Sequence, residues 1–130
     1  MTIAFQQTIP ILRIFDLQKA KEFYVDFLGM TVDWEHRFED SLPVYLQISR
    51  CGLILHLSEH HCDSCPGSTI FVWMTGIEEF HREISSRHYR YARPGIERTF
   101  FDSQSVEIAD PFGNRIRFNE RLNSNVSPTN

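Results

Sequence analysis

The loop at residues 59–65 gathers the side chains in this sequence that are best suited to bind a metal or carry redox chemistry. Cys62 and Cys65 form a C-x-x-C pair, and two histidines come directly before it. Such groups can bind zinc or cycle between thiols and a disulfide. Structural zinc normally needs two well-spaced pairs, however, and redox pairs usually open a helix, which Pro66-Gly67 blocks here. We therefore interpret the segment as a polar loop between two halves of the chain, with metal binding as the alternative.

Composition limits the classes of function that this chain can have. The 130 residues suit one domain, with 42% hydrophobic residues for a core and eleven Phe. The formal net charge of −4 argues against a nucleic-acid partner and favours a cationic small molecule. No apolar run is long enough to span a membrane, and no signal peptide is visible. The odd count of three Cys argues against a disulfide framework and for a cytoplasmic protein.

The elements that must position the functional groups form a pattern that occurs twice, about sixty residues apart. Each copy begins with an apolar strand and continues as a one-faced amphipathic helix, predicted at 17–28 and 77–87. Asp16 is the expected N-cap of the first helix and Gly29 its stop signal. Alternation and turn signals predict strands at 8–15, 31–38, 44–49, 53–58, 69–74, 90–93, 104–109 and 115–120.

These elements predict an α+β domain at residues 1–122, built from two βαβββ modules in tandem at about 8–58 and 68–120. We expect the modules to form half-open sheets around a cleft at their junction, where a ligand can bind. The tail at 123–130 contains mainly Ser, Asn, Pro and Thr and is predicted to be disordered.

Two motifs in the sequence resemble the glyoxalase/bleomycin-resistance/dioxygenase superfamily. They are Leu12-x-x-x-Asp16-Leu17-x-x-Ala20-x-x-Phe23-Tyr24-x-x-x-Leu28-Gly29 and, before the last strand, Asp110-Pro111-x-Gly113-Asn114. The resemblance covers residues 8–120 and implies paired βαβββ modules. It also implies that the enzymes of the superfamily hold a divalent metal in the cleft, with one ligand from each of four strands.

Superfamily spacing places those four ligands at Ile9, His56, Thr69 and Arg117, and the internal repeat pairs the same positions. A divalent ion needs several His, Asp, Glu or Cys donors, whereas Ile donates nothing and Arg remains cationic. We therefore expect no metal, no cofactor and no catalytic residue, which argues against a metal-dependent lyase, epimerase or ring-cleaving dioxygenase. His56 is predicted to be a hydrogen-bonding residue of the cleft wall.

Residues 28–34, 69–80 and 109–114 resemble the metal-free bleomycin resistance proteins in particular. The resemblance implies sequestration of a glycopeptide antibiotic by a homodimer whose chains exchange an N-terminal strand and form two clefts across the interface. Flat rings of the drug would stack on aromatic side chains, and acidic groups would meet its cationic tail. Candidates for the aromatic lining are Trp34, Phe38, Phe71, Trp73 and Phe101. Candidates for the acidic rim are Glu35, Glu39, Glu59 and Asp63, and His56 and Arg117 complete the ligand-binding set.

Plainer interpretations stand beside these assignments. Phe71 and Trp73 share one strand face, opposite to Val72, and we assign the two larger side chains to the cleft. Glu35 and Glu39 are alternatively solvated charges. The leading function is metal-free binding of a bleomycin-type antibiotic or a similar aromatic cation, with no nucleic-acid or membrane partner. The alternatives are a metal-dependent glyoxalase-like enzyme and a binding module for an endogenous aromatic metabolite.

Overall fold

The computed structural model describes residues 2–122, which form two successive groups of elements. The first group is β1 (Ile11–Arg13), α1 (Leu17–Lys21), η1 (Glu22–Phe27), β2 (Thr31–His36), β3 (Tyr45–Arg50) and β4 (Leu53–Ser58). The second is β5 (Thr69–Trp73), α2 (Ile77–Ser85), β6 (Glu97–Arg98), β7 (Ser103–Ala109) and β8 (Arg115–Arg121). Each group is a strand, a helical segment and three strands, which confirms the predicted α+β fold of two βαβββ modules in tandem.

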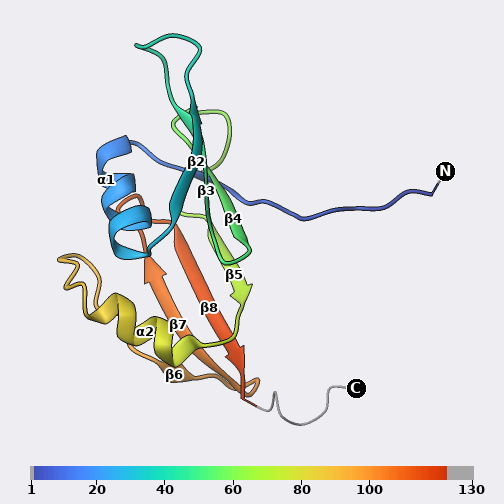
Figure 1. Ribbon diagram of the computed structural model, residues 1–130, viewed down its shortest axis with the longest axis vertical. Helices are drawn as coiled ribbons and strands as arrows, with labels where there is room; N and C mark the ends of the chain where they lie inside the picture. Colours follow the sequence, from blue (N-terminus) through green and yellow to red (C-terminus); the bar gives the residue numbers. More distant parts are fainter. Residues whose placement is uncertain (1, 123–130) are drawn as a thin grey trace.

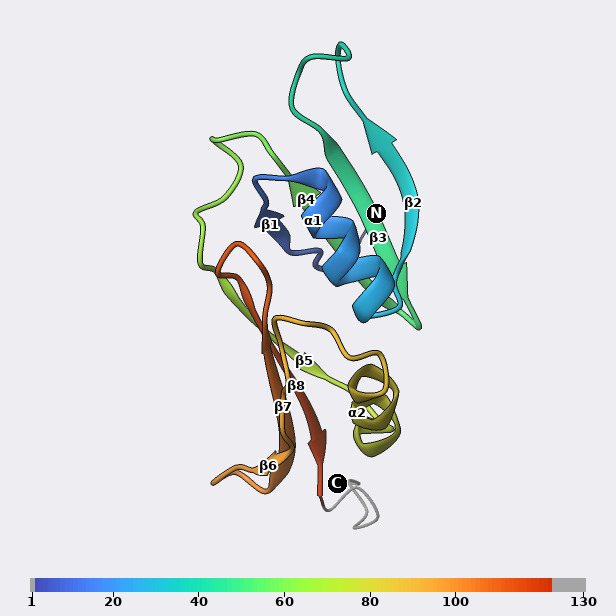
Figure 2. The same cartoon turned by 90° about the vertical axis from the view of Figure 1, so that its left-hand side faces the viewer.

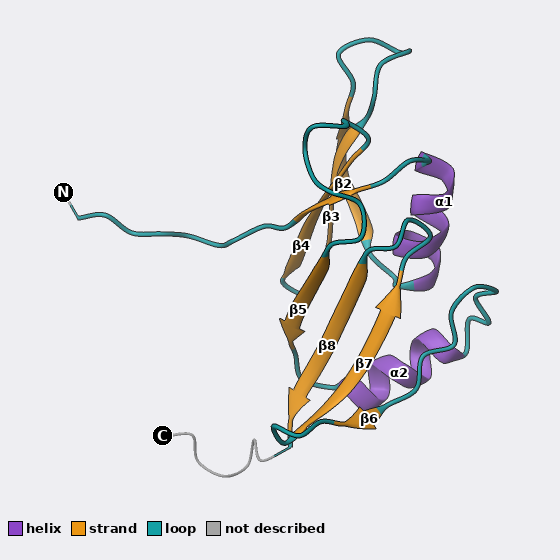
Figure 3. Ribbon diagram, turned by 180° about the vertical axis from the view of Figure 1, so that it is seen from behind, coloured by secondary structure: helices purple, strands orange, loops and turns teal. Residues whose placement is uncertain are grey.

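Each module builds its own four-stranded mixed sheet, in the orders β1-β4-β3-β2 and β5-β8-β7-β6. The first strand of each module pairs parallel with the last strand, and the remaining pairs are antiparallel. The two sheets lie end to end along the long axis of the molecule, with both helices on the same side of them (Figures 1 and 3). Neither sheet closes into a barrel, and Figure 2 shows the helices packed on one face of each. We call the uncovered faces the first and second open faces.

Side-chain alternation along the strands decides which face of each sheet is buried. In β3, Leu46 and Ile48 are fully buried beneath the first helix, whereas Tyr45 and Gln47 point to the other face and are half-buried. The helix contributes an aromatic stripe to this core, made of Phe23, Tyr24 and Phe27. Because the apolar side chains of both sheets point to the helices, the open faces are left to the polar and larger aromatic residues.

The predicted first helix is continuous, but it changes its hydrogen-bonding pattern within its length. Asp16 caps it, since its Oδ1 accepts the N–H of Lys19 at 2.8 Å. From η1 onward the bonds span five residues, as in that from the N–H of Leu28 to the carbonyl of Phe23 at 2.9 Å. Gly29 then ends the helix with a φ of +78°, which confirms its role as the stop.

The turn before β8 joins the second module to the first. The hydroxyl of Tyr24, on the first helix, donates to Asp110 Oδ2 at 2.6 Å, and both side chains are buried. Asn114 Nδ2 donates to the same carboxylate at 2.9 Å and to the carbonyl of Arg13 at 2.8 Å. Burial, and then the Asp110 charge, raise the pKa of Tyr24 well above its ordinary value. The motif at 110–114 therefore holds the two modules together.

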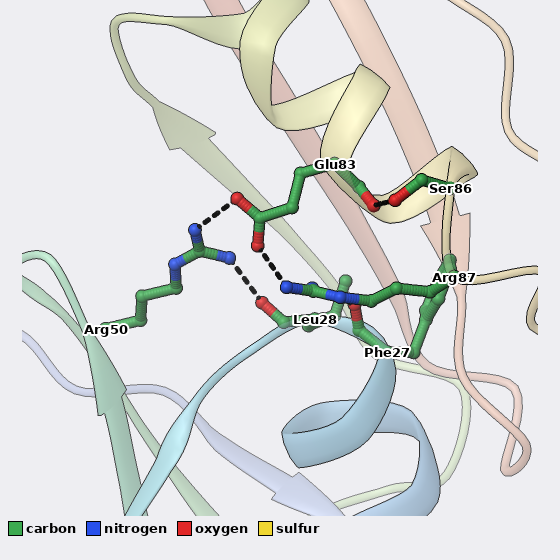
Figure 4. A network of polar contacts seen from close by, with 6 residues as sticks. All are labelled: Phe27, Leu28, Arg50, Glu83, Ser86 and Arg87. Atoms are coloured by element: carbon green, nitrogen blue, oxygen red, sulfur yellow. Dashed lines mark hydrogen bonds and ion pairs between the residues drawn. The ribbon is translucent and has the colours of Figure 1, made fainter.

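A second polar contact joins the modules near the C-terminal end of α2 (Figure 4). Glu83 accepts hydrogen bonds from Arg50 at 2.8 Å and from Arg87 at 2.6 Å. The same two guanidinium groups donate to the carbonyls of Leu28 and Phe27, each at 2.7 Å, where the first helix ends and its carbonyls lack helical partners. The hydrogen bond from Arg50 is the main reason that the pKa of Glu83 is lowered.

Two strand predictions differ from the structure. The first strand, predicted at 8–15, is only Ile11–Arg13. The extended chain before it makes isolated hydrogen bonds, such as that from Gln7 Nε2 to the carbonyl of Gly52 at 3.3 Å, and not the regular ladder of a strand. The strand predicted at 90–93 is wrong. That segment is a turn, and β6 comes later, because the neighbouring Tyr89 stacks on Phe27 of the first module with ring centroids 4.7 Å apart.

The other predicted strands and both helices are confirmed, with ends that shift by at most two residues. Among residues 2–122, no helix combines the length and apolar character that crossing a membrane requires. The tail predicted to be disordered, at 123–130, lies outside the described residues.

Candidate functional site

The first open face carries a cluster of rings that we call the first patch: Trp34, Tyr45 and His56. A bulge in β2 shifts the register after Val32 and brings Trp34 opposite Gln47. Trp34 stacks on Tyr45 with centroids 6.0 Å apart and meets His56 edge-on at 5.4 Å. With 43% of its surface exposed, Trp34 presents a flat apolar surface to solvent.

Both ring nitrogens of His56 are engaged in hydrogen bonds. Nδ1 lies 2.7 Å from the Tyr45 hydroxyl, and Nε2 lies 2.9 Å from Gln47 Oε1. Gln47 donates from its Nε2 to Asp33 at 3.0 Å, so its Oε1 must accept and His56 carries its proton on Nε2. Partial burial, and then the Asp63 charge, raise the pKa of Tyr45, which keeps the phenol as the donor to Nδ1. The predicted hydrogen-bonding role of His56 is confirmed.

The second open face carries a larger cluster, the second patch: Phe71, Trp73 and Phe101. The ring centroids are 4.9 Å apart for Phe71 and Trp73, and Phe101 lies 6.2 and 6.4 Å from these two. Each of the three is between 43% and 46% exposed. The predicted division of β5 is confirmed, because Val72 and Met74 pack toward the core instead. The two patches lie on separate sheets, and the ring contacts found in residues 2–122 link the rings within each patch but not between them.

Arginines from β8 accompany the second patch. Arg117 lies directly opposite Phe71 in the strand register, and its Nε donates to Glu107 at 3.0 Å. Arg121 places its guanidinium carbon 4.0 Å from the centroid of the Trp73 ring, a cation–π contact. Two cationic groups therefore lie beside these aromatic rings.

Of the four acidic candidates, only Asp63 lies close enough to a patch to act on it, through its charge on Tyr45. Glu35 points to the helix-covered side of the first sheet, where it pairs with Lys21 at 2.6 Å, and so faces away from the first patch. Glu59 accepts a backbone N–H at 3.0 Å, and Asp63 accepts a serine hydroxyl at 2.5 Å, both in the loop after β4. Glu39 lies in the hairpin between β2 and β3. These four residues therefore do not form the predicted acidic rim around either patch.

Phe38 and the two cysteines of the C-x-x-C loop make no ring contact or hydrogen bond with the patches among residues 2–122, although His60 of the loop lies 6.5 Å from the Tyr45 ring. Phe38 is 74% exposed in the β2–β3 hairpin and contacts only the His36 ring among the aromatic side chains of residues 2–122. Cys62 and Cys65 are exposed free thiols, and Cys62 Sγ lies 3.4 Å from His61 Nε2. Within residues 2–122, no three His, Cys, Asp or Glu side chains are close enough together to hold a metal ion.

The junction of the modules contains a cavity of about 730 Å³ to which both contribute. The β3–β4 turn and the end of the first helix form one side, and α2 with the end of β5 forms the other. Trp73 and Arg121 line it together with the Arg50–Glu83 pair, so the second patch borders the junction.

Three residues of the open faces were missed from the sequence. Tyr45 alternates with Gln47 and so could have been placed beside His56 once the strands were paired. Arg121 has the same odd-numbered spacing along β8 as Arg115 and Arg117, so alternation could have placed it on the same face. Asp33 had no such signal, because the bulge that places it beside Trp34 breaks the alternation.

Comparison with known proteins defines the class to which this fold and site belong. A family model described as glyoxalase superfamily protein matches residues 1–125. The chain therefore belongs to the glyoxalase superfamily. No curated protein matches the sequence.

Solved structures with the same fold include antibiotic-binding proteins. The bleomycin-binding protein from bleomycin-producing Streptomyces verticillus, complexed with copper(II)-bleomycin, is 21% identical, with a TM-score of 0.68 over 90% of this chain and 97% of that one. TnmS3, an antibiotic binding protein from Streptomyces sp. CB03234, is 19% identical, with a TM-score of 0.70 over 92% and 99%. The bleomycin resistance determinant encoded on the transposon Tn5 is also 19% identical, with a TM-score of 0.66 over 90% and 98%. At these identities the likeness establishes the fold.

Proposed function

We propose that this protein binds a planar aromatic small molecule on its open sheet faces, without a metal ion and without catalysing a reaction. In its most specific form, the proposal is that it sequesters a bleomycin-type antibiotic. The observation that carries the proposal is the pair of exposed aromatic patches on faces that no helix covers. Stacking and apolar burial hold a flat ligand without any nucleophile or metal.

The residues at the superfamily's metal positions support binding rather than metal chemistry. Ile9 has no donor atom, and Arg117 carries a positive charge that already pairs with Glu107. At His56, one nitrogen donates to Gln47 and the other accepts from Tyr45, so a metal would have to break this arrangement. An enzyme of the glyoxalase type would need donors that this set does not offer.

The proposal includes a homodimer. The two open faces belong to separate sheets that lie end to end in one elongated chain, so they do not enclose a ligand between them (Figure 1). A second chain that places its second open face over the first open face of its partner would enclose two equivalent sites. The outer edges of β1 and β5 are unpaired within residues 2–122, and such edges favour association.

Isothermal titration with metal-free bleomycin tests this function. Loss of an aromatic hot spot costs about 2 kcal/mol or more, so Trp73→Ala should weaken binding by roughly 30-fold. Tyr91→Ala is the matched control, because Tyr91 is also an exposed ring but packs on Tyr89, away from the patches. If the Trp73 variant bound bleomycin with unchanged affinity, the second patch would not be part of the binding site. A wild type that binds no bleomycin would exclude the antibiotic and leave the aromatic-metabolite alternative.

A further inference from the structure

The second open face is divided into strips of different chemistry, one for each strand. β5 presents the rings of Phe71 and Trp73, and β8, beside it, presents arginines at 115, 117 and 121. β7 and β6 follow with the carboxylates of Glu107 and Glu97, which lie opposite Arg117 and Ser105 in the register. Neighbouring strands are about 4.8 Å apart. A ligand ring that rests on β5 therefore meets the arginine strip before it reaches the acidic strip.

Two of the arginines bracket the second patch. Arg117 lies beside Phe71 in the register, and Arg121 lies over the Trp73 ring at 4.0 Å. Phe101, from the turn before β7, reaches both of these rings at 6.2 and 6.4 Å, so the patch extends across β8 between the two arginines. The patch thus has a guanidinium group at each end.

The guanidinium groups of Arg117 and Arg121 differ in whether a carboxylate of the protein already pairs with them. Arg117 donates to Glu107 at 3.0 Å, and Arg115 lies 3.7 Å from the same carboxylate, so one negative charge serves two positive ones. Arg121 pairs with no carboxylate among residues 2–122, and its cation–π contact with Trp73 uses none of its N–H groups as hydrogen-bond donors to a carboxylate. These N–H groups remain able to bind an oxyanion.

We infer that the ligand of the second patch is an aromatic anion, a flat ring system that carries a carboxylate or another oxyanion. Its rings stack on the patch, and its anionic group takes hydrogen bonds from Arg121 and Arg117. The inference rests on the proposed binding of a planar aromatic molecule and departs from its bleomycin form, because it replaces the cationic ligand that the net charge and the expected acidic rim had suggested. A cationic group in the same place would face two guanidinium groups at close range.

Three naphthalene ligands of the same shape and different charge separate these possibilities: 2-naphthoate, 2-naphthylmethanol and 2-naphthylmethylammonium. In isothermal titrations at low ionic strength, 2-naphthoate should bind about tenfold more tightly than the ammonium compound, with the alcohol between them. Raising the salt concentration should reduce this preference and leave the affinity for the alcohol nearly unchanged.

Variants then assign the preference to residues. Arg121→Gln should weaken 2-naphthoate about fivefold and change the alcohol less than twofold. Arg117→Gln should do the same or more, because it also leaves Arg115 as the one arginine paired with the Glu107 carboxylate, whose charge then repels the ligand more strongly. Arg82→Gln on the exposed side of α2 removes the same charge from the protein and should change neither affinity.

The possible outcomes are distinct. Equal or tighter binding of the ammonium compound, or arginine variants that behave like Arg82→Gln, would overturn the inference and leave aromatic binding intact. Failure of all three ligands to bind would overturn the proposed function of this patch, and the inference with it.

Discussion

Replacing Glu83 with Gln should weaken the junction between the modules. The substitution keeps the shape of the side chain but removes the charge that Arg50 and Arg87 share. The Gln oxygen can still accept from one arginine, whereas its NH₂ group faces the other as a second donor. Hydrogen bonds to charged groups are worth about 1.5–3 kcal/mol when buried, and exposed ion pairs about 0.2–1 kcal/mol. These three side chains are 29–33% exposed, so we expect a loss of about 1.5 kcal/mol in the free energy of unfolding.

Urea unfolding at a fixed protein concentration measures this loss, and pH tests its cause. The pKa of Glu83 is lower in the folded protein than its ordinary value of 4.5, chiefly through the hydrogen bond from Arg50. A lowered folded pKa gives stability that is fully present above the unfolded pKa and is lost as the pH falls through the folded pKa. The gap between wild type and Glu83→Gln should therefore be constant near pH 7 and shrink below about pH 4.5.

Glu79→Gln is the matched control, because Glu79 lies one turn earlier on α2 and is exposed. It should cost less than about 0.5 kcal/mol, as do most surface substitutions. The reasoning would be refuted if Glu83→Gln cost no more than this control, or if its cost did not change on acidification. Either result would mean that the two arginines are held by the helix carbonyls alone.

Three further predictions concern the other module contact, association and metal. Tyr24→Phe removes one donor to the buried Asp110 carboxylate and should lower the free energy of unfolding by about 1–3 kcal/mol in the same urea assay; a cost near zero would mean that the remaining donors, from Phe112 and Asn114, satisfy that carboxylate. Sedimentation at micromolar concentration should show a dimer, and a protein that remains monomeric would exclude a site shared between two chains. After dialysis against a mild chelator, elemental analysis should find no stoichiometric nickel, zinc or iron; retained metal that survives in a Cys62→Ser/Cys65→Ser variant would favour the enzymatic alternative.

Features that depend on local sequence could be predicted well. The N-cap at Asp16, the stop at Gly29 and the turn at 110–114 each follow from residues adjacent in the chain, and the structure confirms them. That Phe71 and Trp73 share the face opposite to Val72 could also be predicted, because side chains alternate between the two faces of any strand. In each case the physical cause lies within a few residues, where a single sequence can be interpreted without a partner.

Features that depend on distant partners could not be predicted. Nothing near Glu35 indicated that it would pair with Lys21 on the helix-covered side. The segment 90–93 has strand-forming residues, but packing of Tyr89 against the other module decides its conformation. Net charge likewise does not locate individual charges, since a total of −4 does not say that Arg121 lies beside Trp73.

The two contacts between the modules have equivalent places in the repeat but different chemistry. Each joins the region of the turn before one module's last strand to the other module's helix, through Arg50 and Glu83 in one case and Asp110 and Tyr24 in the other. The first is a partly exposed ion pair that salt and acid weaken, whereas the second is buried and shielded from dissolved ions. In concentrated salt the junction should therefore loosen at one end and hold at the other. The two modules would then stay joined at Tyr24 and could rotate about that contact, so the angle between the two open faces should vary with salt concentration.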